Sequence, residues 1–262
     1  MPTQSSKYWA KEKDRYLRQL LISDIEETTG RELVVYFSQL NEGIGHIDSD
    51  DISEVLEGLQ TKSIDLLIQT PGGDVDAVEK IVAVLKQRLD DYRVIVPSWA
   101  KSGGTVIAMS SQKILLGVNS ELGPIDPQMH VTGTGMVPCE YIARDPSLPE
   151  MVRLMAASAV ERMRQLAKKI LMDGMLNEAG EAKLDNVIRE ISSTGSYHSH
   201  GAVIDYSEAE KLGLSVEWLP PEEELWRRIW MLYCCYDYDT KAKKIGKITE
   251  GAVNSIARQS VS

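Results

Sequence analysis

The sequence predicts an α/β protein built on a parallel sheet of repeated strand-turn-helix units with flanking helices. Two observations carry this prediction. Short runs of branched apolar residues alternate with segments whose apolar residues recur at helical spacing. Glycine-bearing turns, Thr-Pro-Gly-Gly-Asp at 70–74 and Ala-Lys-Ser-Gly-Gly-Thr at 100–105, also stand where a strand gives way to a helix. Such alternation favours parallel strands joined by right-handed crossovers.

The elements follow in order along the chain. We expect an N-terminal region at 1–30, a catalytic α/β domain at 31–219 and a C-terminal helix with a polar tail at 220–262. The first region is one helix over about 7–27. Within the domain we expect strands at 33–37, 64–68, 94–96 and 114–116, and a loop at 41–50 before a helix capped by Asp50 or Asp51.

The C-terminal region begins at a Pro-Pro pair, which is followed by three glutamates and a helix with an aromatic face. That face could cover the core of the domain or meet another subunit. Four lysines in the tail form the one basic cluster of the chain, and we expect it to be solvated: Lys241, Lys243, Lys244 and Lys247.

Composition is typical of a cytoplasmic, soluble enzyme. The chain has 262 residues and a net charge of −10, which argues against nucleic-acid binding. Three cysteines form neither a disulfide framework nor a metal-ligand pattern. No run of eighteen apolar residues and no signal-peptide core occurs, so we expect no stable membrane anchor.

The two glycine turns predict a reactive site. Both lie at the C-terminal edge of the predicted sheet, where free backbone N–H groups would stand beside the Ser102 hydroxyl. Unpaired N–H groups stabilise negative charge on a tetrahedral intermediate, and we expect Gly72, Gly73 and Gly103 to donate them. For either motif alone, the alternative is a plain tight turn and a serine N-cap.

The paired turns, with Glu-Leu-Gly-Pro-Ile-Asp-Pro-Gln at 121–128, resemble the Clp-type and signal-peptide-peptidase serine proteases. Within that superfamily the chain is most similar to the serine dehydrogenase proteinase family. The resemblance is dense over about 31–128 and resumes near 199–214. It implies a Clp-crotonase-like fold, Ser102 as nucleophile, oxyanion-hole N–H groups on Gly73 and Gly103, and a homo-oligomer.

The sequence departs from these relatives in the residue that would act as general base for the serine. Clp-type enzymes use a serine-histidine-aspartate triad, but the histidine slot holds Asp126 and the aspartate slot falls near His200. A rearranged set of Ser102, His200 and Asp126 is conceivable, because geometry rather than chain order defines a triad. In the alternative interpretation, His198 and His200 are partly exposed loop residues.

Other candidate bases follow from the related enzymes that use lysine. Lys169 is one, although it shares the polar side of its predicted helix. Lys101 adjoins the serine, and its side chain is more simply explained as orienting the turn or attracting a substrate carboxylate. His130 lies in a stretch, 129–135, that resembles a mobile loop near the active edge.

We therefore expect a serine endopeptidase that cleaves peptides or unfolded proteins through a Ser102 acyl-enzyme, with no metal or organic cofactor. Two other hypotheses remain. One is a catalytically silent scaffold or assembly protein that retains the turns for folding. The other is acyl-thioester chemistry on the related crotonase fold, where paired N–H groups bind a thioester oxyanion.

Overall fold

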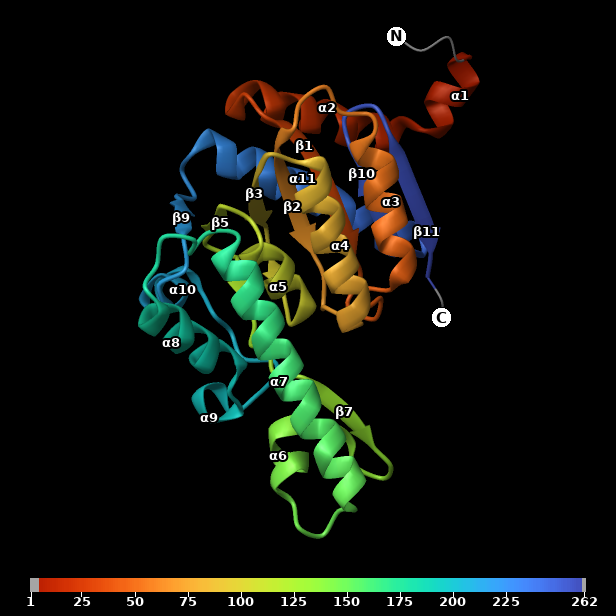
Figure 1. Cartoon of the computed structure of the whole chain (residues 1–262). Coiled ribbons are helices and arrows are strands. Elements are labelled where there is room, and N and C mark those ends of the chain that lie inside the picture. Colours follow the sequence, from red (N-terminus) through yellow and green to blue (C-terminus); the bar gives the residue numbers. More distant parts are fainter. Residues whose placement is uncertain (1–4, 261–262) are drawn as a thin grey trace.

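The computed structural model describes residues 5–260, and a seven-stranded sheet in the order β11-β10-β1-β2-β3-β5-β9 forms its centre (Figure 1). The strands of this sheet are β1 (Glu32–Ser38), β2 (Ser63–Gln69), β3 (Asp91–Val96), β5 (Lys113–Gly117), β9 (Val216–Leu219), β10 (Ile245–Glu250) and β11 (Ser255–Gln259). Strands β1, β2, β3, β5 and β9 are parallel, while β10 and β11 join the β1 edge in antiparallel pairs. The predicted α/β fold is confirmed.

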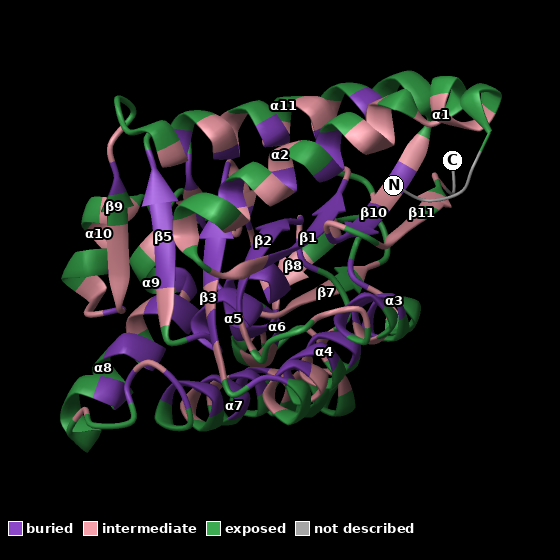
Figure 2. Ribbon diagram, turned by 90° about the horizontal axis from the view of Figure 1, so that it is seen from above, coloured by how far each residue is buried: buried purple, intermediate pink, exposed green. Residues whose placement is uncertain are grey.

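Two layers of helices bury the two faces of the sheet, as Figure 2 shows. On β1, Leu33, Val35 and Phe37 face one core, and the alternate residues Val34 and Tyr36 face the other. The first core is covered by α2 (Lys13–Thr29) and α11 (Glu224–Lys243). The second is covered by α3 (His46–Leu56), α4 (Val75–Arg88), α5 (Gly103–Met109), α7 (Glu150–Met172) and α8 (Glu181–Ser192).

The N-terminal region differs from the single helix expected. It forms α1 (Ser6–Lys11) and α2, which meet at Glu12. The next helix, α3, also begins earlier than expected, because Gly45 rather than Asp50 or Asp51 caps it. The Gly45 N–H donates to the Asp48 carboxylate at 2.7 Å, which supplies an acceptor that the sequence pattern did not indicate.

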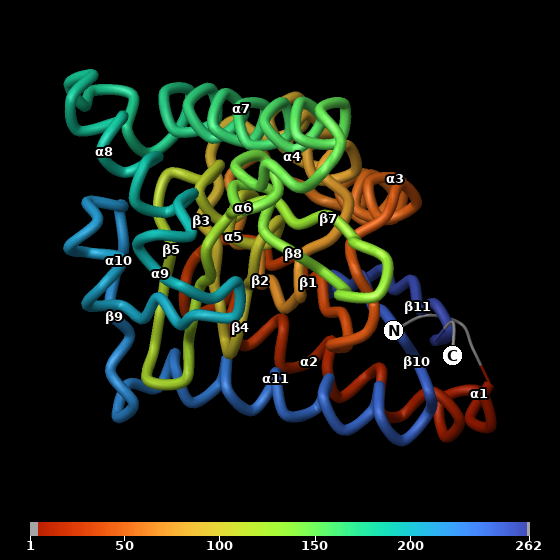
Figure 3. The backbone as a smooth tube through the Cα atoms, turned by 90° about the horizontal axis from the view of Figure 1, so that it is seen from below, coloured from red at the N-terminus to blue at the C-terminus, as the bar shows by residue number. Residues whose placement is uncertain are grey.

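The C-terminal region is part of the same sheet, which corrects the expected polar tail. Helix α11 runs beside α2, so the two ends of the chain share one layer (Figure 3). Strands β10 and β11 follow it. Glu250 of β10 is paired rather than solvated: it is fully buried and accepts from Arg18 Nε at 2.8 Å and from the Tyr236 hydroxyl at 2.6 Å. Paired charges of this kind allow a polar sequence to enter a core.

A small subdomain projects from the body in Figure 1 and carries its own apolar cluster around Cys139 and Ile142. It consists of β7 (Gln128–Val131), β8 (Gly135–Pro138), α6 (Cys139–Arg144) and the first part of α7. The stretch expected as a mobile loop is therefore mainly the antiparallel hairpin of β7 and β8, in which His130 pairs with Met136.

Short elements complete the chain near the carboxyl ends of the central strands. They are β4 (Trp99–Ala100), β6 (Glu121–Leu122), α9 (Thr194–Tyr197) and α10 (Tyr206–Leu212). Strands β4 and β6 pair in parallel, and Leu122 also forms an antiparallel bridge with Ile204. These pairings bring the segments after β3, β5 and α9 to one edge.

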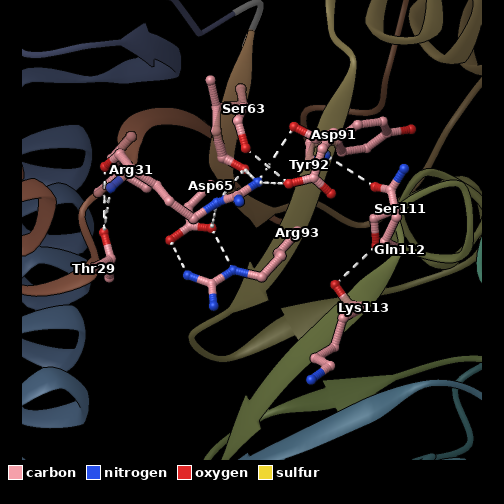
Figure 4. Close-up of polar contacts among 12 residues, drawn as sticks. Thr29, Arg31, Ser63, Asp65, Asp91, Tyr92, Arg93, Ser111, Gln112 and Lys113 are labelled. Atoms are coloured by element: carbon pink, nitrogen blue, oxygen red, sulfur yellow. Dashed lines mark hydrogen bonds and ion pairs between the residues drawn. The ribbon is translucent and has the colours of Figure 1, made fainter. Parts of the chain in front are cut away.

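The opposite edge of the sheet is held by charge pairs (Figure 4). Asp65 is fully buried on β2, and both its oxygens accept from the Arg93 guanidinium at 2.8 Å. Arg31 adds a contact of 3.1 Å to Asp65 and reaches Asp91 at 2.5 Å. Hydrogen bonding to Asp65 raises the pKa of Arg93, although burial opposes this rise. The cluster joins three neighbouring strand starts at the edge far from the glycine turns.

Candidate active site

The glycine turn after β2 requires glycine for steric reasons. Gly72 has a φ of +92°, and a Cβ there would come within 2.7 Å of the Lys101 carbonyl oxygen and 2.8 Å of the Gly103 nitrogen. A side chain at this position would therefore drive the two turns apart. The close approach of the turns, inferred from the sequence, is present in the structure.

The segment after β1 fixes the other glycine of this turn. Ile44 N–H donates to the Gly72 oxygen at 2.7 Å, and Asp74 N–H donates to the Ile44 oxygen at 2.9 Å. A Cβ at Gly73 would lie 2.3 Å from the Ile44 nitrogen. Asp74 then caps α4 by accepting from Ala77 N–H at 3.0 Å, and its negative charge is favourable at a helix N-terminus.

Ser102 lies between β4 and α5 in a conformation that serine seldom adopts. Its φ is 49° and its ψ is −116°, whereas its side chain makes no capping hydrogen bond to α5. A plain N-cap would have an extended backbone and would use the hydroxyl. Backbone strain at a polar residue of this kind is a mark of functional sites, and a sharp strand-to-helix turn presents the hydroxyl at the sheet edge.

Two backbone amides beside Ser102 have no acceptor. In the two turns, Gly72, Asp74 and Gly104 donate to oxygens of the protein. Across residues 5–260, Gly73 and Gly103 donate to no protein oxygen. A Cβ on Gly103 would lie 3.4 Å from the Gly73 nitrogen, so the two amides are neighbours. Such a pair can stabilise an oxyanion.

The structure brings His200 and Asp126 together. The Nδ1 atom of His200 lies 2.8 Å from Asp126 Oδ1, and the Asp126 side chain is only 3% exposed. Its other oxygen accepts from Gln128 Nε2 at 2.6 Å. A carboxylate only accepts, so this contact assigns the proton to Nδ1 and leaves Nε2 as the basic nitrogen.

One cavity of about 920 Å³ joins these features. Ser102, Gly72, Gly73 and His200 all line it. Much of the remaining wall is apolar and includes Leu40, Pro71, Val75, Pro127, Met136 and Met163. A concave, largely apolar hollow with a few convergent polar groups is typical of a substrate site.

The other candidate bases lie elsewhere. Lys169 is exposed on α7, and His130 is exposed on the β7–β8 hairpin. Within the described part of the chain, neither belongs to the cavity wall. Lys101 is only 16% exposed, and its ammonium contacts two main-chain oxygens and the Glu121 carboxylate rather than the cavity. His198 is exposed beyond α9.

The sequence analysis missed one residue near the site. Lys247 of β10 is 12% exposed rather than solvated, and its Nζ lies 2.6 Å from Asp48 and 2.7 Å from the Gly43 oxygen. Asp48 also accepts from Gly45 N–H. The Lys247–Asp48 pair therefore forms hydrogen bonds with both ends of the Gly43–Gly45 segment. That segment holds the glycine turn through Ile44. The sequence gives little strand signal here, because Ile245 and Ile248 are three positions apart and do not alternate with polar residues.

No group of His, Cys, Asp and Glu side chains in residues 5–260 has a geometry suited to a metal ion. Among the helices of the same range, none combines the length and apolar character needed to span a bilayer.

The fold is Clp-crotonase-like, and its largest described hollow near the glycine turns lies beside Ser102. The family model of ClpP-like SDH-type serine proteinases matches residues 43–246, and the chain belongs to this family. The resemblance to serine dehydrogenase proteinases is thereby confirmed.

Two relatives come from Methanocaldococcus jannaschii, and both are described as uncharacterized. MJ0137 is 34% identical over 190 residues, which cover 68% of this chain and 63% of that protein. MJ1495 is 27% identical over 177 residues, which cover 65% of this chain and 59% of that protein. The chain thus matches less than two thirds of the length of either relative.

A solved structure of a ClpP1 mutant from Listeria monocytogenes is also similar. It is 17% identical with a TM-score of 0.47, and the alignment covers 80% of this chain and 99% of that one.

Proposed function

We propose that this protein is a serine peptidase whose catalytic residues are Ser102, His200 and Asp126. The observation that carries the proposal is the shared cavity: His200 is paired with buried Asp126 and lines the same hollow as strained Ser102. Chain order differs from that of Clp-type enzymes, but the roles depend on geometry alone.

The proposed reaction proceeds through an acyl-enzyme. The Ser102 oxygen attacks the peptide carbonyl carbon while His200 Nε2 accepts the hydroxyl proton. The carbonyl oxygen becomes an oxyanion, which accepts hydrogen bonds from the free N–H groups of Gly73 and Gly103. Collapse breaks the C–N bond, and the imidazolium gives its proton to the leaving amine. Water, deprotonated by His200, then hydrolyses the ester and regenerates Ser102.

The buried carboxylate has two roles in this scheme. Asp126 holds the His200 ring in the tautomer that leaves Nε2 free, and its charge stabilises the imidazolium formed during attack. Gln128 in turn holds the carboxylate. The apolar wall favours an apolar substrate side chain, and the hollow suits an unstructured peptide rather than a folded protein.

A fluorophosphonate probe and a set of fluorogenic peptides test the proposal. Wild-type protein should be labelled and should hydrolyse peptides with apolar residues next to the cut bond. Ser102→Ala should do neither while keeping its fold by circular dichroism. Lys113→Met is the matched control, because Lys113 forms a half-exposed ion pair with Glu217 on β9. Labelling of Ser102→Ala at the wild-type rate, or an unreactive wild-type protein, would refute the proposed role.

A further inference from the structure

Lys101 directly precedes the candidate nucleophile. Its side chain does not line the cavity and instead reaches the main chain at Leu122. Its Nζ donates to the carbonyl oxygens of Leu122, at 3.1 Å, and Ala202, at 3.0 Å. Glu121 Oε1 lies 3.1 Å from the same nitrogen. The ammonium has three N–H groups, and these three oxygens satisfy them.

The two carbonyl partners belong to the segments that carry the histidine and the aspartate. Ala202 follows His200 by two residues, and Leu122 precedes Asp126 by four. Near the same point, Leu122 and Ile204 exchange two backbone hydrogen bonds of 2.9 and 3.1 Å. The Lys101 ammonium therefore lies where the two segments pair, only a few residues away from both His200 and Asp126.

The backbone of Lys101 is held in place by hydrogen bonds to both turns. Its N–H donates to the Thr70 oxygen at 3.0 Å, and its oxygen accepts from Gly104 N–H at 2.7 Å. The alkyl chain packs over Gly123, where a Cβ would come 2.7 Å from Lys101 Cδ. Lys101 thus contacts the serine turn and the glycine turn through its backbone, and both segments of the pair through its side chain, which is 16% exposed.

We infer that Lys101 is a positioning residue that sets the place of the His200–Asp126 pair relative to Ser102. This inference rests on the proposed function. Reacting groups must be held within a fraction of an ångström, and a displacement of about 1 Å costs on the order of 100-fold in rate. Lys101 is not itself the base, since its three N–H groups are all engaged and it presents no free lone pair to the Ser102 hydroxyl.

Lys101→Met tests this role, because methionine keeps the apolar length of the side chain and removes the donors. We expect kcat to fall about 10- to 100-fold while KM changes less than about twofold, since misplacement affects the reaction more than binding. Hydrogen exchange in 199–204 should accelerate. Lys101→Arg should recover most of the lost kcat, and Glu121→Gln, which retains both carbonyl bonds, should lose much less than Lys101→Met.

Three results would overturn the role. One is a folded Lys101→Met variant with wild-type kcat. Another is unchanged exchange in 199–204. The third is complete loss of activity in both Lys101→Met and Lys101→Arg with normal exchange, which would make Lys101 a chemical participant. If Lys101→Met does not fold, Lys101→Gln, a shorter neutral donor, takes its place with the same two measurements.

The exchange measurement is repeated in Ser102→Ala, so that it does not depend on hydrolysis. A wild-type protein that neither hydrolyses nor reacts with the probe contradicts the peptidase, and exchange in the Lys101 variants still reports whether the segment is held. An active wild type with an equally active Lys101→Met contradicts only the positioning role.

Discussion

The Nζ of Lys247 donates to the carbonyl oxygen of Gly43 at 2.7 Å, although 204 positions separate the two residues in the sequence. The same nitrogen pairs with Asp48, which is buried and caps α3 through Gly45. A C-terminal strand is thereby connected to the loop that borders the glycine turn.

Replacing Lys247 should affect both stability and activity. Lys247→Met leaves the Asp48 carboxylate buried without its cation, and removal of one partner of a buried pair costs about 3–5 kcal/mol. We expect a lower free energy of unfolding in urea and a lower kcat/KM, because the Gly43–Gly45 segment loses its anchor. Lys241→Met is the control. Its exposed pair with Asp237 contributes no more than about 1 kcal/mol. Equal stability of the two variants would contradict a stabilising role for the buried Lys247–Asp48 pair.

The strained backbone of Ser102 predicts a difference between two inactive variants. Ser102→Gly should unfold at a higher temperature than Ser102→Ala, because glycine tolerates a φ of 49° and a ψ of −116° and alanine does not. Strain of this type amounts to about 1–3 kcal/mol, which exceeds the entropic cost of glycine in the unfolded chain. Thermal midpoints of both variants measure the difference. A less stable glycine variant would show that this turn is relaxed.

The Asp126 carboxylate should contribute more to the reaction than to binding. Asp126→Asn keeps the size of the side chain but can present an NH₂ group to His200, so the ring is held in the wrong tautomer. In an established triad this change costs about 10,000-fold in kcat. We expect kcat to fall by at least about 1,000-fold, with KM close to the wild-type value.

The other candidates for the general base can be tested in the same assay as Asp126→Asn. His200→Ala should abolish hydrolysis as fully as Ser102→Ala. Lys169→Ala and His130→Ala should retain activity, because both side chains are exposed on α7 and on the β7–β8 hairpin. Loss of turnover in the Lys169 or His130 variant, together with an active His200→Ala, would reassign the base.

The cysteines should differ in their reaction with iodoacetamide. Burial and, second, the nearby Asp126 charge raise the pKa of Cys139 to about 11. At pH 8 only about one thiol in a thousand is then ionised, and thiolate is the reactive form. Cys234 is exposed and should be alkylated first, as mass spectrometry of tryptic peptides would reveal. Rapid modification of Cys139 in the native protein would contradict the packing of α6 against α7.

The sequence predicts best where a local rule decides the structure. The glycine turns, with their branched strands and helical periodicity, indicated the sheet and the neighbouring turns, because both signals lie within a dozen residues. Gly72 shows why: the φ of +92° and the approach of Lys101 leave room for no other residue.

Contacts between distant segments were beyond such rules. The sequence suggested His200 and Asp126 only as conceivable partners, since nothing local encodes a contact across 74 positions. Strand β10 was missed because Lys247 was expected to be solvated. Its partner Asp48 lies far away in the sequence, as does Arg18, the partner of buried Glu250. The hairpin of β7 and β8 was missed because its glycines and threonines resemble a loop.

The position of β10 in the sheet also bears on the order in which parts of the site become available during translation. A chain that has emerged from the ribosome only as far as α11 already contains Ser102, Asp126 and His200, yet it lacks the strand that supplies Lys247 and pairs with β1. The loop beside the glycine turn then has no cation to hold it. We therefore expect this loop to reach its final position only after β10 has been translated and has paired with β1.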